Sequence, residues 1–170
     1  RGQRFIGVTF NIEERKRKEI ERESLTRTLK MLGECNSELI HASSEQALLE
    51  SICKLLVETG GYLMAWIGFA EQDAAKSISV RAHWGDQNNY LDKITASWRD
   101  TKLGGGPSGE SIKTNSVIIN QDFVENQAME PWQENAVKHG FQSSIALPIT
   151  NKNGVFAVLN IYAPKTQAFQ

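Results

Sequence analysis

The 170-residue chain contains 19 basic and 20 acidic side chains, with 40% hydrophobic and 23% charged residues. This length suits one domain with a helical extension, and the composition is that of an ordinary globular protein. A formal net charge of −1 provides no general attraction to nucleic acid or anionic lipid, so we expect neither nucleic-acid binding nor direct membrane contact.

The two cysteines, Cys35 and Cys53, lie in stretches of helical character that are far apart in sequence. They support neither a disulfide framework nor a zinc site, and they fit a reduced, cytoplasmic setting. The sequence has no signal peptide and no apolar run of membrane-spanning length. Because it begins without Met inside a strand-like segment, we interpret it as part of a longer polypeptide.

The first residues alternate like a short strand over Arg4–Phe10 and then become densely charged and free of Gly and Pro. The charged stretch predicts an exposed helix. The junction at residues 11–16, NIEERK, resembles the C-terminal end of a PAS domain, where a last strand leads into a signalling helix. Asn11 and Glu13 depart from the usual Asp-Ile-Thr. The resemblance implies that residues 1–11 are the remnant of a PAS-like domain.

A leucine heptad follows within the expected linker helix, residues 12–43. Its members step by four, three, four and three residues: Leu25, Leu29, Leu32, Asn36 and Leu39. Leucines at d-like positions and Asn36 at an a-like position are typical of a parallel two-stranded coiled coil. We therefore expect a homodimer through this helix; the alternative is that the stripe packs on its own domain.

The next segments alternate between helix and strand signals. Ser43 and Gln46 suggest a capping box for a helix that Gly60-Gly61 would end near Thr59. The strand expected over Tyr62–Ala70 is apolar on both faces and therefore central, whereas Ser77–Trp84 alternates and suits a sheet edge. Its His83 should be exposed. A short helix is expected over Tyr90–Trp98.

A Gly-rich loop comes next, with Gly104, Gly106 and Gly109 in a G-x-G-x-x-G spacing. A dinucleotide fingerprint requires a preceding strand, and a phosphate-binding loop requires a Lys after its last Gly. The sequence provides neither, so we expect a flexible loop that turns into a short helix at Ser108.

The C-terminal third predicts a short strand at Ser116–Asn120, a helix from Pro131 to about His139, and a β-hairpin. The hairpin strands, Ser143–Ile149 and Val155–Tyr162, lack alternation and are apolar throughout much of their length. They should therefore be covered on both faces and form the centre of an antiparallel sheet.

The order of these elements, the loop GGGPSGESIKTNSVIINQDF with Asp122, and the later HGFQSSIALPI and GVFAVLNIY resemble a GAF domain over residues 45–162. The resemblance implies an α+β fold, with a central antiparallel sheet, flanking helices and a long N-terminal helix. It places a sensor domain at residues 44–164 and the start of a linker at residues 165–170.

GAF domains are regulatory modules, so the resemblance implies a non-catalytic sensor in a multi-domain bacterial signalling protein. Its output domain would be a diguanylate cyclase or phosphodiesterase, or a histidine kinase. No cofactor is identified. Asn151-Lys152 and Phe156 lack the Asp-Glu that completes the cyclic-nucleotide motif, and neither cysteine lies where a covalent bilin attaches, so both ligand classes are disfavoured.

Five large aromatic residues are the candidates to line a ligand pocket between the sheet and residues 98–115: Trp66, Trp84, Trp98, Phe123 and Trp132. A receptor should contain a cavity of about 300 Å³ or more. Two alternatives remain, a ligand-free dimerisation spacer and a small-molecule enzyme on the same scaffold. Such an enzyme would need an activated thiolate, and no cysteine follows Cys53.

Overall fold

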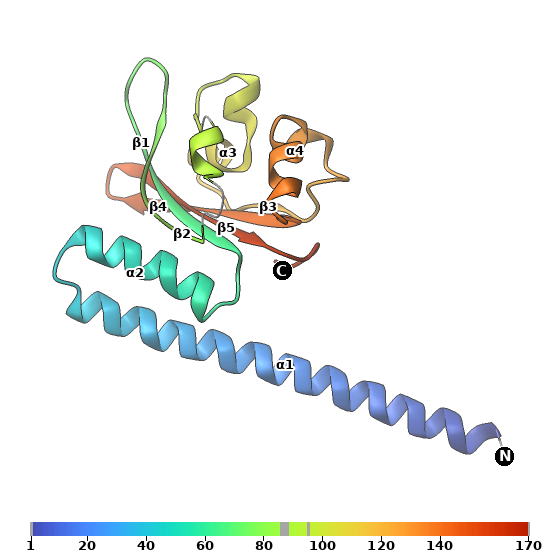
Figure 1. The fold of residues 1–170 in the computed structure, drawn as a ribbon. Helices are drawn as coiled ribbons and strands as arrows, with labels where there is room; N and C mark the ends of the chain where they lie inside the picture. The colour runs from blue at the N-terminus through green and yellow to red at the C-terminus, as the bar shows by residue number, and fades with distance from the viewer. Residues whose placement is uncertain (1, 86–88, 95, 170) are drawn as a thin grey trace.

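The computed structural model describes residues 2–85, 89–94 and 96–169 and confirms the expected α+β fold (Figure 1). The helices are α1 (Gly2–His41), α2 (Glu45–Glu58), α3 (Pro107–Thr114) and α4 (Glu130–Lys138), with short 3₁₀ turns at Leu91–Lys93, Lys102–Gly105 and Gln127–Met129. The strands are β1 (Met64–Ala70), β2 (Ile78–Trp84), β3 (Ile118–Asn120), β4 (Ser143–Asn151) and β5 (Gly154–Ala163).

The strands form one antiparallel sheet in the order β2-β1-β5-β4-β3. The hairpin β4–β5 lies at its centre, as its lack of a polar face predicts, and β2 lies at an edge. Trp66 of β1 and Ala146 of β4 both pair with Asn160 of β5, so this register brings the three strands into one row.

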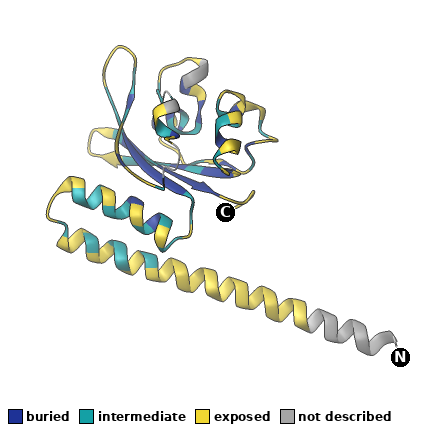
Figure 2. Ribbon diagram, in the orientation of Figure 1, coloured by how far each residue is buried: buried dark blue, intermediate teal, exposed yellow. Residues whose placement is uncertain are grey.

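Each face of the sheet is covered by helices, and Figure 2 shows the buried strands between them. On one side, here called the α3 face, Trp66, Val158 and Tyr162 belong to a core that is covered by α3, α4 and the loops around them. On the other side, the α2 face, Ile67 and Ile161 pack with Cys53 and Leu56 of α2. The fold therefore has a core on each side of one sheet.

Helix α1 runs from Gly2 to His41, and its end packs on α2, where the Thr59 hydroxyl donates to Glu34 at 2.8 Å. The strand expected at Arg4–Phe10 is wrong, because these residues belong to α1. A helix satisfies its own backbone groups, whereas a single strand without a sheet leaves them unpaired.

The leucine stripe of α1 lies away from α2. Leu25, Leu29, Leu32 and Leu39 are between 52% and 61% exposed, and Asn36 is exposed as well. The alternative that the stripe packs on its own domain is therefore wrong. The residues of α1 that face the domain are others, among them Met31.

Two local predictions need correction. The N-cap of α2 is Ser44 and not Ser43: Ser44 has an extended backbone, and its hydroxyl accepts from the Ala47 N–H at 3.2 Å. Gln46 donates to Glu50 and to the Arg81 carbonyl. The helix expected over Tyr90–Trp98 is only the 3₁₀ turn Leu91–Lys93, because Ala96 and Trp98 form backbone hydrogen bonds with the β1–β2 hairpin.

Candidate ligand-binding site

A cavity of about 40 Å³ lies on the α3 face, between the sheet and the segments that cover it. Its floor is Trp66 of β1, Ser144 of β4, and Asn160 and Tyr162 of β5. Its roof is Gly106–Gly109 at the start of α3. Its walls contain Tyr90, Ile94, Ala96, Ser97, Phe123, Met129 and Trp132. The expectation of a cavity of about 300 Å³ or more is therefore wrong. The observed space suits only a ligand of few heavy atoms.

The floor is polar although it is buried. The Trp66 indole N–H donates to the Tyr162 hydroxyl at 3.4 Å, and Tyr90 provides a second hydrogen bond to the same group. Burial raises the pKa of Tyr162 above its usual value, and these two hydrogen bonds offset only part of that rise. Tyr162 is therefore a neutral phenol at physiological pH.

Asn160 is the other polar group of the floor. It is 2% exposed, and the Ser108 hydroxyl donates to its Oδ1 at 2.7 Å, which joins β5 to α3 across the cavity. Its Nδ2 has no hydrogen-bond partner among the residues that the structure describes. Buried amide donors are almost always paired in folded proteins, so this one marks a place where a further acceptor fits.

The structure brings together three of the five aromatic candidates, Trp66, Phe123 and Trp132, at the cavity. Trp84 lies on the α2 face, 39% exposed, with Lys54 Nζ 5.3 Å from the centre of its ring. Trp98 lies beside the turn of the β1–β2 hairpin, where Lys76 Nζ is 4.2 Å from its ring. These two residues do not line the cavity.

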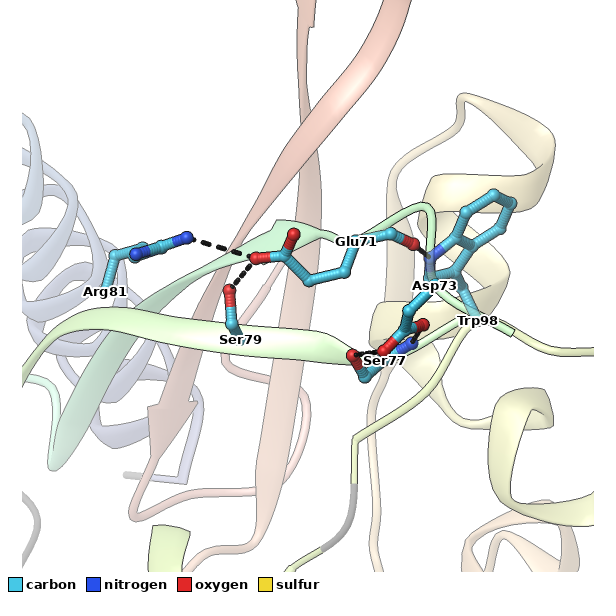
Figure 3. Close-up of polar contacts among 6 residues, drawn as sticks. All are labelled: Glu71, Asp73, Ser77, Ser79, Arg81 and Trp98. Atoms are coloured by element: carbon cyan, nitrogen blue, oxygen red, sulfur yellow. Dashed lines mark hydrogen bonds and ion pairs between the residues drawn. The ribbon is translucent and has the colours of Figure 1, made fainter. Parts of the chain in front are cut away.

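Trp98 instead helps to fix the cavity wall, through hydrogen bonds to the β1–β2 hairpin. Its indole N–H donates to the Glu71 carbonyl at 3.1 Å (Figure 3). Its backbone N–H donates to the Lys76 carbonyl at 2.9 Å. The adjacent Ser97 hydroxyl donates to the Ala75 carbonyl at 3.0 Å. Because Ser97 also lines the cavity, the hairpin turn and the wall are held together.

The hairpin turn is itself held by side chains. Asp73 accepts from the Ser77 N–H at 2.9 Å and from the Ser77 hydroxyl at 2.6 Å, and these bonds lower the pKa of Asp73 (Figure 3). Glu71 accepts from the Ser79 hydroxyl and pairs with Arg81 at 3.1 Å. These groups stabilise the turn, and we assign them no catalytic or ligand-binding role.

Sequence reasoning missed Ser144, Asn160 and Tyr162 as cavity residues. One signal was present: Asn160 interrupts the otherwise apolar run from Val155 to Ile161 in a strand that must be covered on both faces. A polar side chain at such a position has to find a buried partner. Periodicity does not reveal which segment would provide that partner.

The Gly-rich loop has a packing explanation. It begins within the 3₁₀ turn Lys102–Gly105 and does not follow a strand, and it leads into α3 as expected. A Cβ on Gly104 would lie 1.7 Å from the Arg99 carbonyl oxygen, and one on Gly109 would lie 2.4 Å from the Gly104 oxygen. Backbone approaches this close require glycine without any phosphate ligand.

The cysteines lie outside the cavity. Cys53 is fully buried on the α2 face, where burial raises its pKa to about 12. Cys35 lies on α1, half-buried, and its pKa is raised by burial and by Glu34 and Glu38. Neither thiol is activated, because the reactive form is the thiolate.

We expect Cys53 of the folded protein to resist iodoacetamide at pH 8, while Cys35 reacts slowly. Peptide mass spectrometry before and after unfolding measures both labelling rates, and labelling of Cys53 at the rate of Cys35 would contradict the burial.

Above about pH 9, the folded protein keeps a proton on Cys53 that the unfolded chain releases. The stability from this thiol is therefore complete below about pH 9 and is lost as the pH rises towards 12.

In residues 2–85, 89–94 and 96–169, no group of three or more His, Cys, Asp or Glu side chains is placed to hold a metal ion. His83 is exposed, as expected. His139, near the end of α4, has its Nδ1 2.7 Å from the Asn135 carbonyl oxygen and packs against Tyr90 and Phe141.

Within the same described ranges, no helix is long and apolar enough to cross a membrane.

The family model of the GAF domain matches residues 42–170. The chain belongs to the GAF domain family. That match begins at the break between α1 and α2 and contains the whole sheet and the cavity. No curated protein matches the chain.

Solved structures confirm the fold of this GAF domain. The A. aeolicus nlh2 GAF domain in an inactive state is 15% identical with a TM-score of 0.65, and the match covers 86% of this chain and 83% of that one. The GAF domain of a Coxiella burnetii phosphoenolpyruvate-protein phosphotransferase is 16% identical with a TM-score of 0.67, covering 85% and 82%. Free methionine-R-sulfoxide reductase from Neisseria meningitidis, in complex with its substrate, is 13% identical with a TM-score of 0.69, covering 87% and 79%.

Proposed function

We propose that this GAF domain is a non-catalytic sensor module that binds a small molecule in the cavity, dimerises through α1, and transmits the signal through its terminal helices. The observation that carries the proposal is the cavity itself: an apolar, aromatic-walled space on a polar floor, beneath the start of α3. A few convergent polar groups in an apolar cavity are typical of small-molecule sites.

The central strands connect the cavity to the helices. Trp66 and Asn160 face the cavity, while their neighbours Ile67 and Ile161 on the same strands pack on α2. Helix α2 in turn holds α1, through the Thr59–Glu34 hydrogen bond and adjacent packing. A ligand that shifts β1 or β5 would therefore also shift the surface on which α1 rests, because packed interiors transmit displacement.

The chemistry of the cavity favours a receptor over an enzyme. The solved relative from N. meningitidis is an enzyme on a similar fold, so the fold alone does not decide. Cys35 and Cys53 both lie outside the cavity and have raised pKa values. The polar groups of the floor are a neutral phenol, an indole, an amide and a hydroxyl, and among the described residues none is paired with a base.

For the parent protein we propose a cytoplasmic multi-domain sensor in which a PAS-like domain precedes this one. The support is the sequence resemblance of residues 11–16, NIEERK, alone, since α1 takes the place of the strand expected before them. Residues 12–43 would be the signalling linker, 44–164 the sensor and 165–170 the start of a linker to a diguanylate cyclase, phosphodiesterase or histidine kinase. A ligand-free dimerisation spacer is the second candidate, and the exposed leucine stripe on α1 favours it equally.

A thermal-shift screen of small polar compounds on the full chain tests the receptor. A ligand at 100 times its Kd stabilises the folded protein by about 2.7 kcal/mol, which should raise Tm by about 5–10 °C. Ala96→Leu, which adds three carbons at the cavity wall, should abolish the shift, and the exposed Ala128→Leu should retain it. If no compound gives a shift that Ala96→Leu abolishes, the spacer is the correct function.

A further inference from the structure

Asn160 is held in one orientation by a partner on the other side of the cavity. Its Oδ1 accepts the Ser108 hydroxyl at 2.7 Å, which directs the side-chain amide between β5 and α3. The remaining polar atom, Nδ2, is buried and lacks an acceptor among the described residues, while the residue as a whole lines the cavity. A buried donor without an acceptor is costly, and because this one lines a cavity, an acceptor from outside the chain can reach it.

The roof of the cavity, like Asn160 Nδ2, favours an atom that accepts a hydrogen bond. Gly106–Gly109 line it where α3 begins, and the N–H groups in the first turn of a helix have no acceptor within the helix. The N-terminal end of a helix also carries a partial positive charge. Both the roof and Asn160 on the floor therefore favour a ligand atom that carries a partial negative charge.

No Asp, Glu, Lys, Arg or His is present among the described residues that line the cavity. An ion would have to leave water without a counter-charge, which is far less favourable than the transfer of a neutral molecule. Trp66, Phe123 and Trp132 provide apolar and aromatic surface for the rest of the ligand. The lining therefore suits an uncharged molecule with one acceptor oxygen.

We propose that the cavity selects a small uncharged molecule whose oxygen accepts a hydrogen bond from Asn160 Nδ2, such as a short ketone, aldehyde or sulfoxide. This inference depends on the proposed receptor function and names the ligand class of the same site. The cavity volume of about 40 Å³ sets the size. At about 10–15 Å³ for each water-sized position, it accommodates roughly three to four heavy atoms.

Three probes of the same trigonal shape separate the effect of charge from that of size. Acetone is neutral and carries only an acceptor, acetate is an anion, and acetamidinium is a cation that only donates. Each is titrated into the ¹⁵N-labelled full chain, with the Asn160 side-chain amide and the Ser108 and Gly109 backbone amides as signals. We expect acetone to shift all three signals saturably, at millimolar concentration because the ligand is so small, and the two ions to bind at least tenfold more weakly.

Asn160→Leu removes the donor, keeps a branched side chain of the same length and should weaken acetone binding at least tenfold. Asn120→Leu is the matched control: Asn120 is 1% exposed, its Nδ2 also lacks a partner among the described residues, and it does not line the cavity. This control should bind acetone as the parent does. If Asn160→Leu fails to fold, the shift of the Asn160 amide signal in the parent protein remains the deciding measurement.

Four outcomes overturn the proposal. Tighter binding of acetate would show that the cavity accepts an anion, and tighter binding of acetamidinium would show that Asn160 presents its oxygen. Acetone binding that leaves the Asn160 signal unmoved would place the ligand elsewhere. If no probe binds while a compound from the thermal-shift screen does so in an Ala96-dependent way, the ligand class is wrong and the receptor function stands.

Discussion

Leu32→Lys is expected to convert a dimer of this chain into a monomer. Leu32 is 52% exposed on α1, and Leu25, Leu29 and Leu39 continue the stripe at 60%, 61% and 60%. Burying a leucine stabilises a protein by about 1.5–3 kcal/mol, and a two-fold seam would bury each position twice. A lysine at a d-like position would remove that gain and oppose two like charges, so we expect the dimer Kd to rise at least 100-fold.

Sedimentation equilibrium over a concentration series measures this effect. Ser37→Lys is the matched control, since Ser37 is exposed on the same helix but lies beside the stripe. Asn36→Leu replaces the polar residue of the seam and should change the oligomeric state in a different way, by strengthening association or allowing higher oligomers. If Leu32→Lys and Asn36→Leu both sediment like the parent chain, the seam on α1 is wrong.

The centre of the sheet could be predicted from the sequence because its signal is local. A hairpin whose strands have no polar face must be covered on both sides, and β4 and β5 are. The edge position of β2 and the end of α4 next to His139, where Gly140 follows with a φ of +76°, depend on equally local rules. Each of these predictions is confirmed.

The face on which each side chain lies was harder to predict. Strict alternation over β2 places Ile78, Ala82 and Trp84 on one face. The register instead pairs Ile67 with Ala82 and Gly68 with Val80, which leaves Arg81 as an extra residue. This bulge inverts the alternation, so Ile78 packs on the α3 face while Ala82 packs on the α2 face. Trp84 is therefore turned away from the cavity.

The polar floor was missed for a different reason. Ser144 and Asn160 come from the β4–β5 hairpin, whereas Ser108 in the roof precedes Asn160 by 52 residues, and only the fold brings it to the floor. Sequence can indicate that Asn160 needs a partner, but the partner depends on tertiary contacts between β5 and α3. Large aromatic residues identified three cavity positions because they fill space, whereas the hydrogen-bonding groups had no comparable pattern.

The second large effect is expected for Gly109→Ala. A Cβ at Gly109 would lie 2.4 Å from the Gly104 carbonyl oxygen and 2.5 Å from the Ser97 carbonyl oxygen. Both atoms belong to the backbone and cannot rotate away, so α3 has to move. Overpacking of this kind typically costs about 1–3 kcal/mol, and we expect the upper part of that range, a fall in Tm of about 5–10 °C.

Gly105→Ala is the control from the adjacent 3₁₀ turn, because the Cβ that it adds meets no described atom within 4 Å. Differential scanning calorimetry of the two variants separates the packing effect at Gly109 from the general effect of replacing a glycine near the start of α3. Ser97 and Gly109 both line the cavity, so Gly109→Ala should also weaken ligand binding, whereas Gly105→Ala should not. Equal stability of the two variants, with a nucleotide phosphate bound by the loop, would show that these glycines are kept for a ligand and that the packing explanation is wrong.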